Sequence, residues 1–206
     1  MQVIELQYLP QPAYIAQFLL HDDLVIDGHE NYVKQTYRNR CRILGANGVD
    51  QLSVPVTGSG KGIRTREIKI DHGQKWLNRH WRAIQSAYGR APYFEYYSDD
   101  FAVIFNRKHK YLFDLATELL TQCLENLQFD IKLNFSEAYI ENPEKDLRDI
   151  ISPKSAAGKA ISYKQLPYQQ VFGSNFVEGL SILDLIFCEG PQAGELLKSG
   201  VSSGTL

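Results

Sequence analysis

Short apolar runs alternate with amphipathic stretches along this chain, and that alternation limits the folds it can adopt. The segment MQVIELQY and the runs DLVID and LSVPV have the alternating or β-branched pattern of strands. Helical periodicity follows the first strand at AYIAQFLL, and it returns over residues 75–88 and over most of residues 99–127. Strands interleaved with helices indicate an α/β domain with a mixed sheet flanked by helices, and an α+β domain is the alternative.

Local signals refine several element boundaries. Asp99 or Asp100 suits the N-cap of the long helical stretch, and Ser181 suits the start of a short helix in LSILDLIFCEGP that ends at Gly190. Pro55 cannot donate to a strand ladder, so it predicts an edge strand or a bulge. The segment TREIKID alternates polar with apolar residues and predicts a further strand.

The chain is long enough for one domain with a substantial core. Its 206 residues contain no internal repeat and no low-complexity tract, so we expect a single domain over residues 1–206. Residues 142–162, NPEKDLRDIISPKSAAGKAIS, are polar, charged and small. They predict an excursion over the surface.

Charge and cysteine content exclude several classes of protein. The net charge of −2 gives no general attraction to nucleic acid or to an anionic membrane. No stretch approaches the roughly 18 apolar residues of a spanning helix, and the N-terminus lacks a secretory pattern. The cysteines, three in all, are far apart, which argues against a disulfide framework and a zinc site. We expect a cytoplasmic protein without membrane insertion, bound metal or cofactor.

A helix around His80 is the first candidate for chemistry. In WLNRHWRAIQSAYGRAPYFEYY, Trp76, His80, Ile84 and Tyr88 are four residues apart and form one stripe of the helix. The imidazole is either a packed structural group or a general acid or base that lines a pocket. For the second case, we expect the His80 ring to be reachable by solvent.

The same helix makes two further predictions. Leu77 and Trp81 should be buried beneath His80 if that ring lines a pocket. The following aromatic loop, APYFEYY, is either part of the core or an interaction patch.

Arginines cluster in two places. In YRNRCR, Arg38, Arg40 and Arg42 are two residues apart and would share one face of an extended segment, with Asn39 on the other face. Such a face is either an anion clamp or a solvated strand surface. Arg79 and Arg82 flank His80. If these arginines face one cleft, we expect that cleft to bind phosphate.

A lone carboxylate and a glycine-rich loop complete the candidates. Asp184 is the only charge in LSILDLIF, so it lies at an exposed helix edge or is buried with a partner, for which Arg38 and His80 are candidates. The loop TGSGKG has the glycines and the lysine, Lys61, of a phosphate loop, but it departs from the Walker spacing and suits a hairpin loop better.

Several segments together resemble the WbqC-like protein family. The segments are YRNRCRIL, LSVPV, REIKID, the His80 helix and QVFGSNFVEGLSILDLIFCEGP, and they cover roughly residues 1–190. The family opening HQPxYLP is similar to LQYLPQPAY, where Gln7 is retained and Leu6 replaces the histidine. The family's acidic pair is here Asp27 followed by Gly28.

The resemblance implies a set of site residues. It suggests catalytic roles for His80, Asp184 and Asp27 and substrate binding by the following residues: Gln7, Arg38, Asn39, Tyr88, Tyr168 and Gln170. His80 matches the histidine of the family's WxxxH helix, and Tyr168 and Gln170 in PYQQVF match a YxQ-like element. We expect residues near early strand ends, such as Gln7 and Asp27, to meet Arg38 in one crevice, with Arg38 within reach of His80 or Asp184.

The resemblance also implies a function class. Family members are bacterial and are often encoded among genes for surface polysaccharides such as O-antigen. We therefore expect a cytoplasmic enzyme, such as a transferase, that acts on a nucleotide sugar or another small anionic metabolite. The alternative is a non-catalytic partner protein of the same pathway, and either protein can form a homo-oligomer.

Overall fold

Four short strands form a parallel sheet. The computed structural model describes residues 1–58, 60, 62–153 and 162–204. The sheet has the order β7 (Asn134–Phe135), β2 (Leu24–Ile26), β1 (Gln2–Ile4) and β8 (Lys145–Asp146). Because all three pairings are parallel, the carboxyl ends of the four strands lie along one edge.

Two antiparallel strand pairs stand apart from this sheet. A six-residue ladder joins β3 (Arg40–Gly45) to β4 (Gly48–Ser53), and a shorter one joins β5 (Val56–Thr57) to β6 (Lys69–Ile70). The 3₁₀ turn η1 (Thr65–Glu67) lies between β5 and β6.

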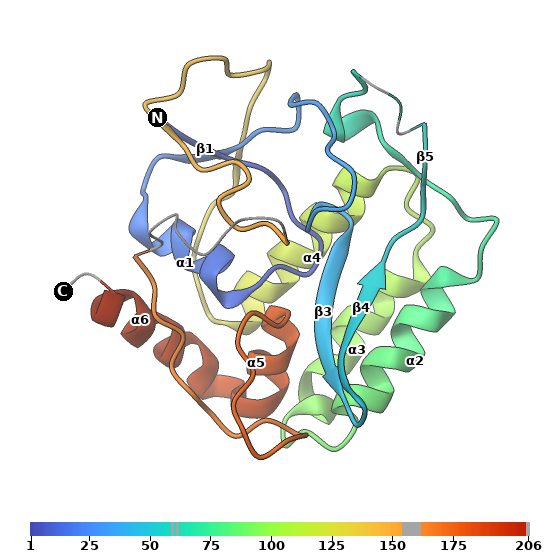
Figure 1. Ribbon diagram of the computed structural model, residues 1–206, viewed down its shortest axis with the longest axis vertical. Coiled ribbons are helices and arrows are strands. Elements are labelled where there is room, and N and C mark those ends of the chain that lie inside the picture. The colour runs from blue at the N-terminus through green and yellow to red at the C-terminus, as the bar shows by residue number, and fades with distance from the viewer. Residues whose placement is uncertain (59, 61, 154–161, 205–206) are drawn as a thin grey trace.

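Helices cover the strands on several sides (Figure 1). They are α1 (Pro12–Leu20), α2 (Trp76–Tyr88), α3 (Phe94–Asn106), α4 (Leu112–Asn126), α5 (Ile182–Glu189) and α6 (Ala193–Gly204), with a 3₁₀ turn η2 (Gly190–Gln192) before the last. Helix α4 contacts α3, α5 and η1, while α2 packs against β3 and α6 against α1. The predicted α/β domain is confirmed, with parallel pairing in the main sheet and the antiparallel pairs separate from it.

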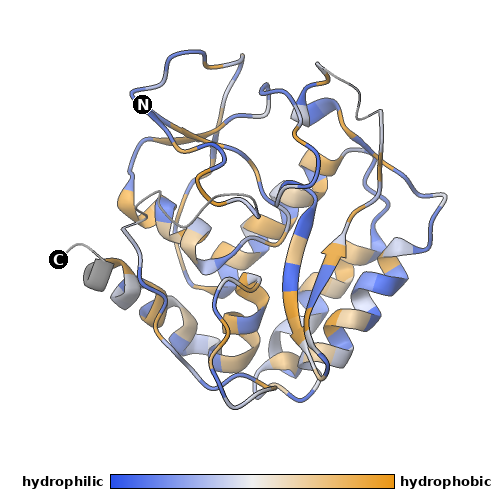
Figure 2. Ribbon diagram, viewed as in Figure 1, coloured by the Kyte–Doolittle hydropathy of each residue, from blue (hydrophilic) through white to orange (hydrophobic). Residues whose placement is uncertain are grey.

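One continuous core joins the sheet to the helices. Figure 2 shows hydrophobic and hydrophilic positions alternating along α2, as expected for a helix with one buried face. Phe187 of α5 contacts the rings of Tyr88, Phe94 and Phe101, so α2, α3 and α5 share one aromatic cluster. Helix α4 lies beside the carboxyl edge of the sheet, where Phe113 of its first turn contacts Phe135 of β7 and Arg66 of η1.

The structure confirms some predicted boundaries and corrects others. Ser181 caps α5, since its hydroxyl accepts from the amide of Leu183, and Gly190 ends the helix with a positive φ of 52°. Asp99 and Asp100 are not caps, because α3 already begins at Phe94. The strand predicted at TREIKID is mostly wrong: its first residues form η1, and of this segment only Lys69–Ile70 form a strand.

The predicted surface excursion over residues 142–162 is partly wrong. Residues 145 and 146 pair with β1 as strand β8, and Leu147 and Ile151 are buried in the core. Three apolar residues within this polar stretch anchor it to the core: Leu147, Ile150 and Ile151. Residues 154–161 of the excursion, and residues 59 and 61 of the glycine-rich loop, lie outside the described part of the chain.

Three further observations concern the cysteines, membrane-spanning helices and metal ligands. Cys41, Cys123 and Cys188 are free and buried. Over the described ranges, no helix is both long and apolar enough to cross a bilayer. Among the same residues, no three histidine, cysteine or acidic side chains gather as metal ligands would.

Candidate active site

Each strand of the parallel sheet is followed by a polar residue at its carboxyl end. Glu5 follows β1, Asp27 follows β2 and Ser136 follows β7, while Arg148 comes two residues after β8. Ile4 lies opposite Ile26 in the β1–β2 register, so the two carboxylates that follow leave the sheet side by side. The carboxyl edge of a parallel sheet is where α/β domains most often place their ligands.

Asp27 is fully buried and saturated with donors. Its Oδ1 accepts from the His29 amide at 2.8 Å and from Ser136 Oγ at 2.9 Å, and its Oδ2 accepts from Arg148 Nη1 at 2.9 Å. Arg148 also binds both oxygens of Asp146. The predicted site residue Asp27 is therefore held by one cation and two neutral donors.

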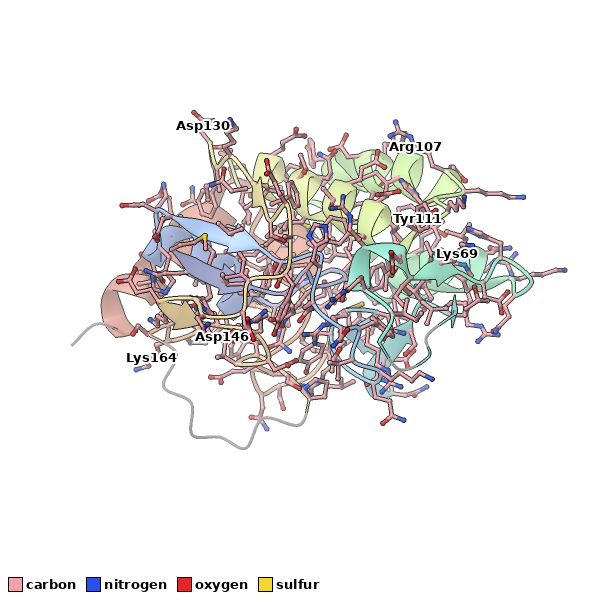
Figure 3. The ribbon with its side chains drawn as sticks, turned by 90° about the horizontal axis from the view of Figure 1, so that it is seen from above. Lys69, Arg107, Tyr111, Asp130, Asp146 and Lys164 are labelled. Atoms are coloured by element: carbon pink, nitrogen blue, oxygen red, sulfur yellow. The ribbon has the colours of Figure 1, made fainter. Side chains whose placement is uncertain are left out.

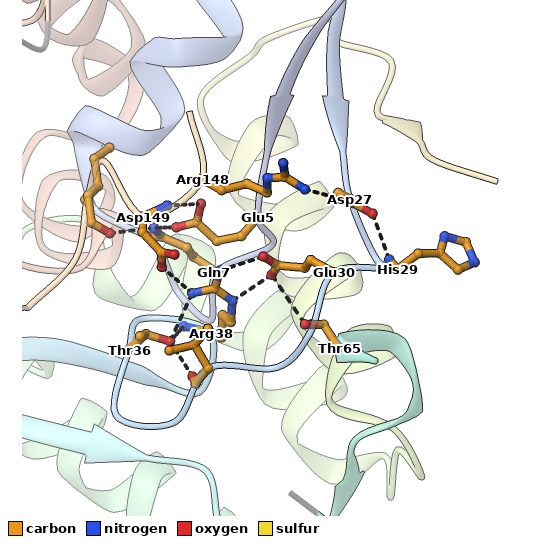
Figure 4. A network of polar contacts seen from close by, with 12 residues as sticks. Glu5, Gln7, Asp27, His29, Glu30, Thr36, Arg38, Thr65, Arg148 and Asp149 are labelled. Atoms are coloured by element: carbon orange, nitrogen blue, oxygen red, sulfur yellow. Dashed lines mark hydrogen bonds and ion pairs between the residues drawn. The ribbon is translucent and has the colours of Figure 1, made fainter. Parts of the chain in front are cut away.

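Glu5 and Gln7 lie beside Asp27 on the same edge (Figure 4). The Gln7 amide donates to Glu5 Oε1 at 2.6 Å, and the amide of Asp149 donates to Glu5 Oε2 at 3.0 Å. Burial raises the pKa of Glu5 to about 7, despite the nearby Arg38 charge. Asp149 holds a positive φ of 61°, a conformation that aspartate tolerates better than most residues.

Arg38 is buried at the centre of the same network, with 1% of its surface exposed. Its guanidinium binds Glu30 through Nε at 2.6 Å and Nη2 at 2.7 Å, and it binds Asp149 Oδ1 through Nη1 at 2.6 Å. Thr65 donates a further hydrogen bond to Glu30. Since two carboxylates already bind the buried guanidinium of Arg38, it is neither a free anion clamp nor part of a solvated strand surface, the two alternatives that the sequence left open.

We call the residues that meet at this edge the carboxyl-edge network. Its members are Glu5, Gln7, Asp27, His29, Glu30, Arg38, Ser136, Arg148 and Asp149. The predicted convergence of Gln7, Asp27 and Arg38 is thus seen. The predicted contact of Arg38 with His80 or Asp184 is not formed within the described ranges.

His80 occupies a different and closed environment. It is only 2% exposed, its Nδ1 lies 2.8 Å from the hydroxyl of Tyr8, and its ring packs against Trp76. Burial lowers the pKa of His80 to about 4, so the ring is neutral at neutral pH. The expectation of a solvent-reachable imidazole is wrong, because the stripe that carries His80 is the face of α2 packed against β3.

The other predictions for α2 also change. Leu77 and Trp81 are only half-buried, on the edge of the packed face and not beneath His80. Arg79 and Arg82 are exposed, whereas Arg38 is buried, so these arginines do not form one cationic cleft.

Asp184 forms a second buried cluster with three of the predicted binding residues. Its Oδ2 accepts from the Tyr168 hydroxyl at 2.7 Å and from the Gln170 amide at 2.8 Å, and burial raises its pKa. Tyr88 lies beside it, with no exposed surface. Gln170 also binds both backbone groups of Val177, so together with its bond to Asp184 it ties the segment before α5 to that helix.

The remaining predicted residue, Asn39, has a backbone partner. Its side-chain amide donates to the carbonyl of Val54 at 2.9 Å and holds the start of β3 near the end of β4. Its Oδ1 is buried and makes no hydrogen bond among the described residues. The catalytic and binding roles of all the residues inferred from the sequence remain predictions.

Two adjoining pockets open beside the carboxyl-edge network. The inner pocket, of about 410 Å³, is lined by Gly28, Arg66, Phe113, Asp114, Thr117, Glu118, Phe135 and Ser136. The outer pocket, of about 710 Å³, is lined by Thr57, Gly58, Ile63, Arg66, Glu67, Lys69, Tyr111, Phe113 and Asp114. Because they share three residues of η1 and α4, the pockets form one groove along the first turn of α4. Lys69 and Tyr111 lie side by side at its outer end (Figure 3).

Arg66 connects the groove to the buried network. Its Nη1 lies 2.8 Å from His29 Nε2, and its guanidinium carbon stands 6.0 Å from the centre of the Phe113 ring. The groove and the network also meet at Gly28, which follows Asp27. A Cβ added to Gly28 would lie 2.9 Å from the Phe113 ring. Because Gly28 has no side chain, it leaves room for the Phe113 ring beside the inner pocket.

Sequence reasoning missed several residues of the network and the groove: Glu5, His29, Glu30, Arg66, Ser136, Arg148 and Asp149. The strands that position Ser136 and Arg148, β7 and β8, have only two residues each, too few for a periodic signal. His29 and Arg66 lie in turns whose partners are distant in sequence. Of these two residues, only His29 had a signal in the sequence, because it lies two residues after Asp27.

Comparisons with known proteins give the family. The sequence model of the WbqC-like protein family matches residues 6–162 and 148–196. The chain belongs to the WbqC-like protein family. It is also similar to the uncharacterized protein Rv1507c of Mycobacterium tuberculosis (strain ATCC 25618 / H37Rv), with 26% identity over 224 residues, which covers 95% of this chain and 96% of that relative. No solved structure matches the chain.

Proposed function

We propose that this WbqC-like protein is an enzyme, of the transferase class, that binds a nucleotide sugar or a similar phosphate-bearing metabolite in the α4 groove. The observation that supports the proposal most is that the carboxyl-edge network and the first turn of α4 face the same groove. One side offers groups that transfer protons, and the other offers groups that bind phosphate.

The outer pocket has features that suit phosphate. Arg66 and Lys69 line it, and both are exposed. The 15-residue helix α4 begins there, and its N-cap residue Tyr111 makes no side-chain capping hydrogen bond. The amide of Leu112 already binds the carbonyl oxygen of Ile68, so the attraction of α4 for an anion comes from its next amides. Two nearby cations add to that attraction.

The same pocket also offers groups that suit a sugar or a base. Glu67 and Asp114 can accept hydrogen bonds from hydroxyl groups, and the rings of Tyr111 and Phe113 offer apolar faces. A ligand with phosphate, hydroxyl and ring components satisfies this mixture better than a simple anion does. Nucleotide sugars have all three components, and surface-polysaccharide synthesis in the bacterial cytoplasm consumes them.

A thermal-shift comparison tests this proposal. We expect UDP-glucose to raise the melting temperature by on the order of 5–10 °C at about 100 times its Kd, and free glucose to raise it far less. Arg66→Gln should remove most of this response, and added salt should weaken it. Gly28→Ala should also reduce it, because the new methyl group pushes Phe113 toward the inner pocket.

Arg82→Gln is the matched control, since Arg82 is also an exposed arginine, lies on α2 and is outside both pockets. It should leave the response to UDP-glucose unchanged. An equal response to UDP-glucose and glucose, or the same loss in Arg66→Gln and Arg82→Gln, would count against a phosphate-binding groove.

Two observations favour a second candidate function, that of a non-catalytic partner protein. The first is that His80, Arg38 and Asp184 lie in separate environments and not in one pocket. The second is an exposed apolar face. Tyr96 is 77% exposed and Val103 is 53% exposed, and these residues lie seven positions apart on one face of α3. Such a face suits contact with another protein or a second copy of this chain. Analytical ultracentrifugation of the wild type and of Tyr96→Ser tests the second-copy version, since a dimer through this face should weaken in the variant.

A further inference from the structure

His29 lies at the outer end of the carboxyl-edge network, with its ring directed away from Arg38 (Figure 4). It is half-buried, and it joins two groups that line the inner pocket. Its Nδ1 lies 3.1 Å from Ser136 Oγ, and its Nε2 lies 2.8 Å from Arg66 Nη1. Ser136 Oγ in turn lies 2.9 Å from Asp27 Oδ1.

The chemistry of arginine fixes the direction of these hydrogen bonds. A guanidinium only donates, so His29 Nε2 must accept from Arg66 and must carry a lone pair. The proton of the neutral ring is therefore on Nδ1 and is donated to Ser136 Oγ. The Ser136 hydroxyl then donates to Asp27, whose carboxylate only accepts.

This direction is opposite to that of a serine nucleophile. In an acyl-transfer triad, the serine hydroxyl donates to the imidazole, and the imidazole donates to the carboxylate. Here the serine stands between the imidazole and the carboxylate, and its proton points toward Asp27. Ser136 is thus a bridge that orients His29, and the basic nitrogen of the group is His29 Nε2.

We infer that His29 is the general base of the proposed enzyme, and that it is released for this role when an anionic group of the substrate binds Arg66. The inference rests on the proposed function and identifies the acting residue. His29 Nε2 takes a proton from a hydroxyl or amine group of the acceptor substrate. The new N–H bond replaces the O–H or N–H bond, and its electron pair stays on the acceptor atom as a nucleophile.

Charge balance explains why the anionic group is needed. A protonated His29 next to Arg66 would place two positive charges at hydrogen-bond distance. A phosphate on Arg66 neutralises one of them and removes its donor from Nε2. The charge that develops on His29 is stabilised on the other side by Asp27, through Ser136. Asp27 and Ser136 are positioning residues, because they act through His29.

Nitrogen NMR of the histidine rings tests this inference. In the free protein, His29 should be protonated at Nδ1 only. Inorganic pyrophosphate should shift the His29 Nε2 signal as Arg66 leaves it, and Arg66→Leu should abolish that shift. Ser136→Ala should cause loss of the His29 Nδ1 proton signal, because that proton loses its acceptor and exchanges with water. Ser86→Ala, which changes an exposed serine of α2, should leave it in place.

His72 is an internal reference in the same spectra. Its Nε2 lies 2.7 Å from the carbonyl oxygen of His109, so its proton must be on Nε2, and it should not respond to pyrophosphate. A His29 ring protonated at Nε2 would overturn the inference. So would pyrophosphate that stabilises the protein without shifting His29, and that result would leave the proposed function intact. Absence of any stabilisation by pyrophosphate or UDP-glucose would contradict both.

Discussion

Glu30→Ala should lower the free energy of unfolding by about 3–5 kcal/mol. The substitution removes both short contacts that Glu30 makes with the guanidinium of Arg38 and leaves that buried cation with Asp149 and Thr36. The side chain of Asp149 is 45% exposed, so it compensates the charge less well than Glu30 does. Urea denaturation, followed by circular dichroism, measures the change.

Glu195→Ala is the matched control for this prediction. Glu195 forms an exposed ion pair with Lys198 on α6, and removing such a pair costs roughly 0.5 kcal/mol or less. The double variant Glu30→Leu with Arg38→Met should recover part of the lost stability, because it removes both buried charges. A loss below about 1 kcal/mol in Glu30→Ala would show that Arg38 is not held as described.

As the pH rises, the free energy of unfolding of Glu5→Gln should increase relative to that of the wild type. The total change in this difference should be about 3 kcal/mol. Burial raises the pKa of Glu5 from 4.5 to about 7 in the folded protein. Between these two values the folded state keeps a proton that the unfolded state has lost. The contribution of Glu5 to stability is therefore complete at low pH and is lost as the pH rises through about 7. Glutamine stays neutral and avoids this loss.

Only the difference between the two proteins isolates Glu5. Burial lowers the pKa of His80 from 6.5 to about 4, so His80 makes the folded state more stable over an overlapping range as the pH rises. His80 is present in both proteins, and its effect cancels in the difference. Urea denaturation of both proteins at about pH 5 and about pH 8 gives the difference in their free energies of unfolding at each pH. A constant difference would mean that Glu5 is already ionised near its usual pKa.

The sequence predicts the longer helices of this fold because their patterns are periodic, and it predicts the short helix α5 because its start is capped. The stripe Trp76, His80, Ile84 and Tyr88 defines α2, and Ser181 marks the start of α5. The same stripe led to the wrong prediction that the His80 ring is reachable by solvent. A histidine at helical spacing with large apolar residues lies on the packed face, and the polar partner that satisfies it, Tyr8, is 72 residues away.

The candidate site was predicted in part for a related reason. Gln7 and Asp27 follow the early strands, and a residue after a parallel strand reaches the carboxyl edge. Ser136 and Arg148 reach the same edge from two-residue strands, which are formed by pairing with distant partners and not by local preference. The lone carboxylate Asp184 was expected either exposed or buried with a partner, and it is buried with Tyr168 and Gln170.

Mapping of UDP-glucose onto the backbone amides by nitrogen–proton NMR tests the central claim most directly. Ligand binding in the α4 groove should shift the amide signals of Gly28, Phe113 and Asp114 and leave those of Arg79 and Arg82 on α2 unchanged. Saturable shifts confined to α2, or to the segment around Tyr168 and Asp184, would contradict the assignment of the carboxyl edge as the active site.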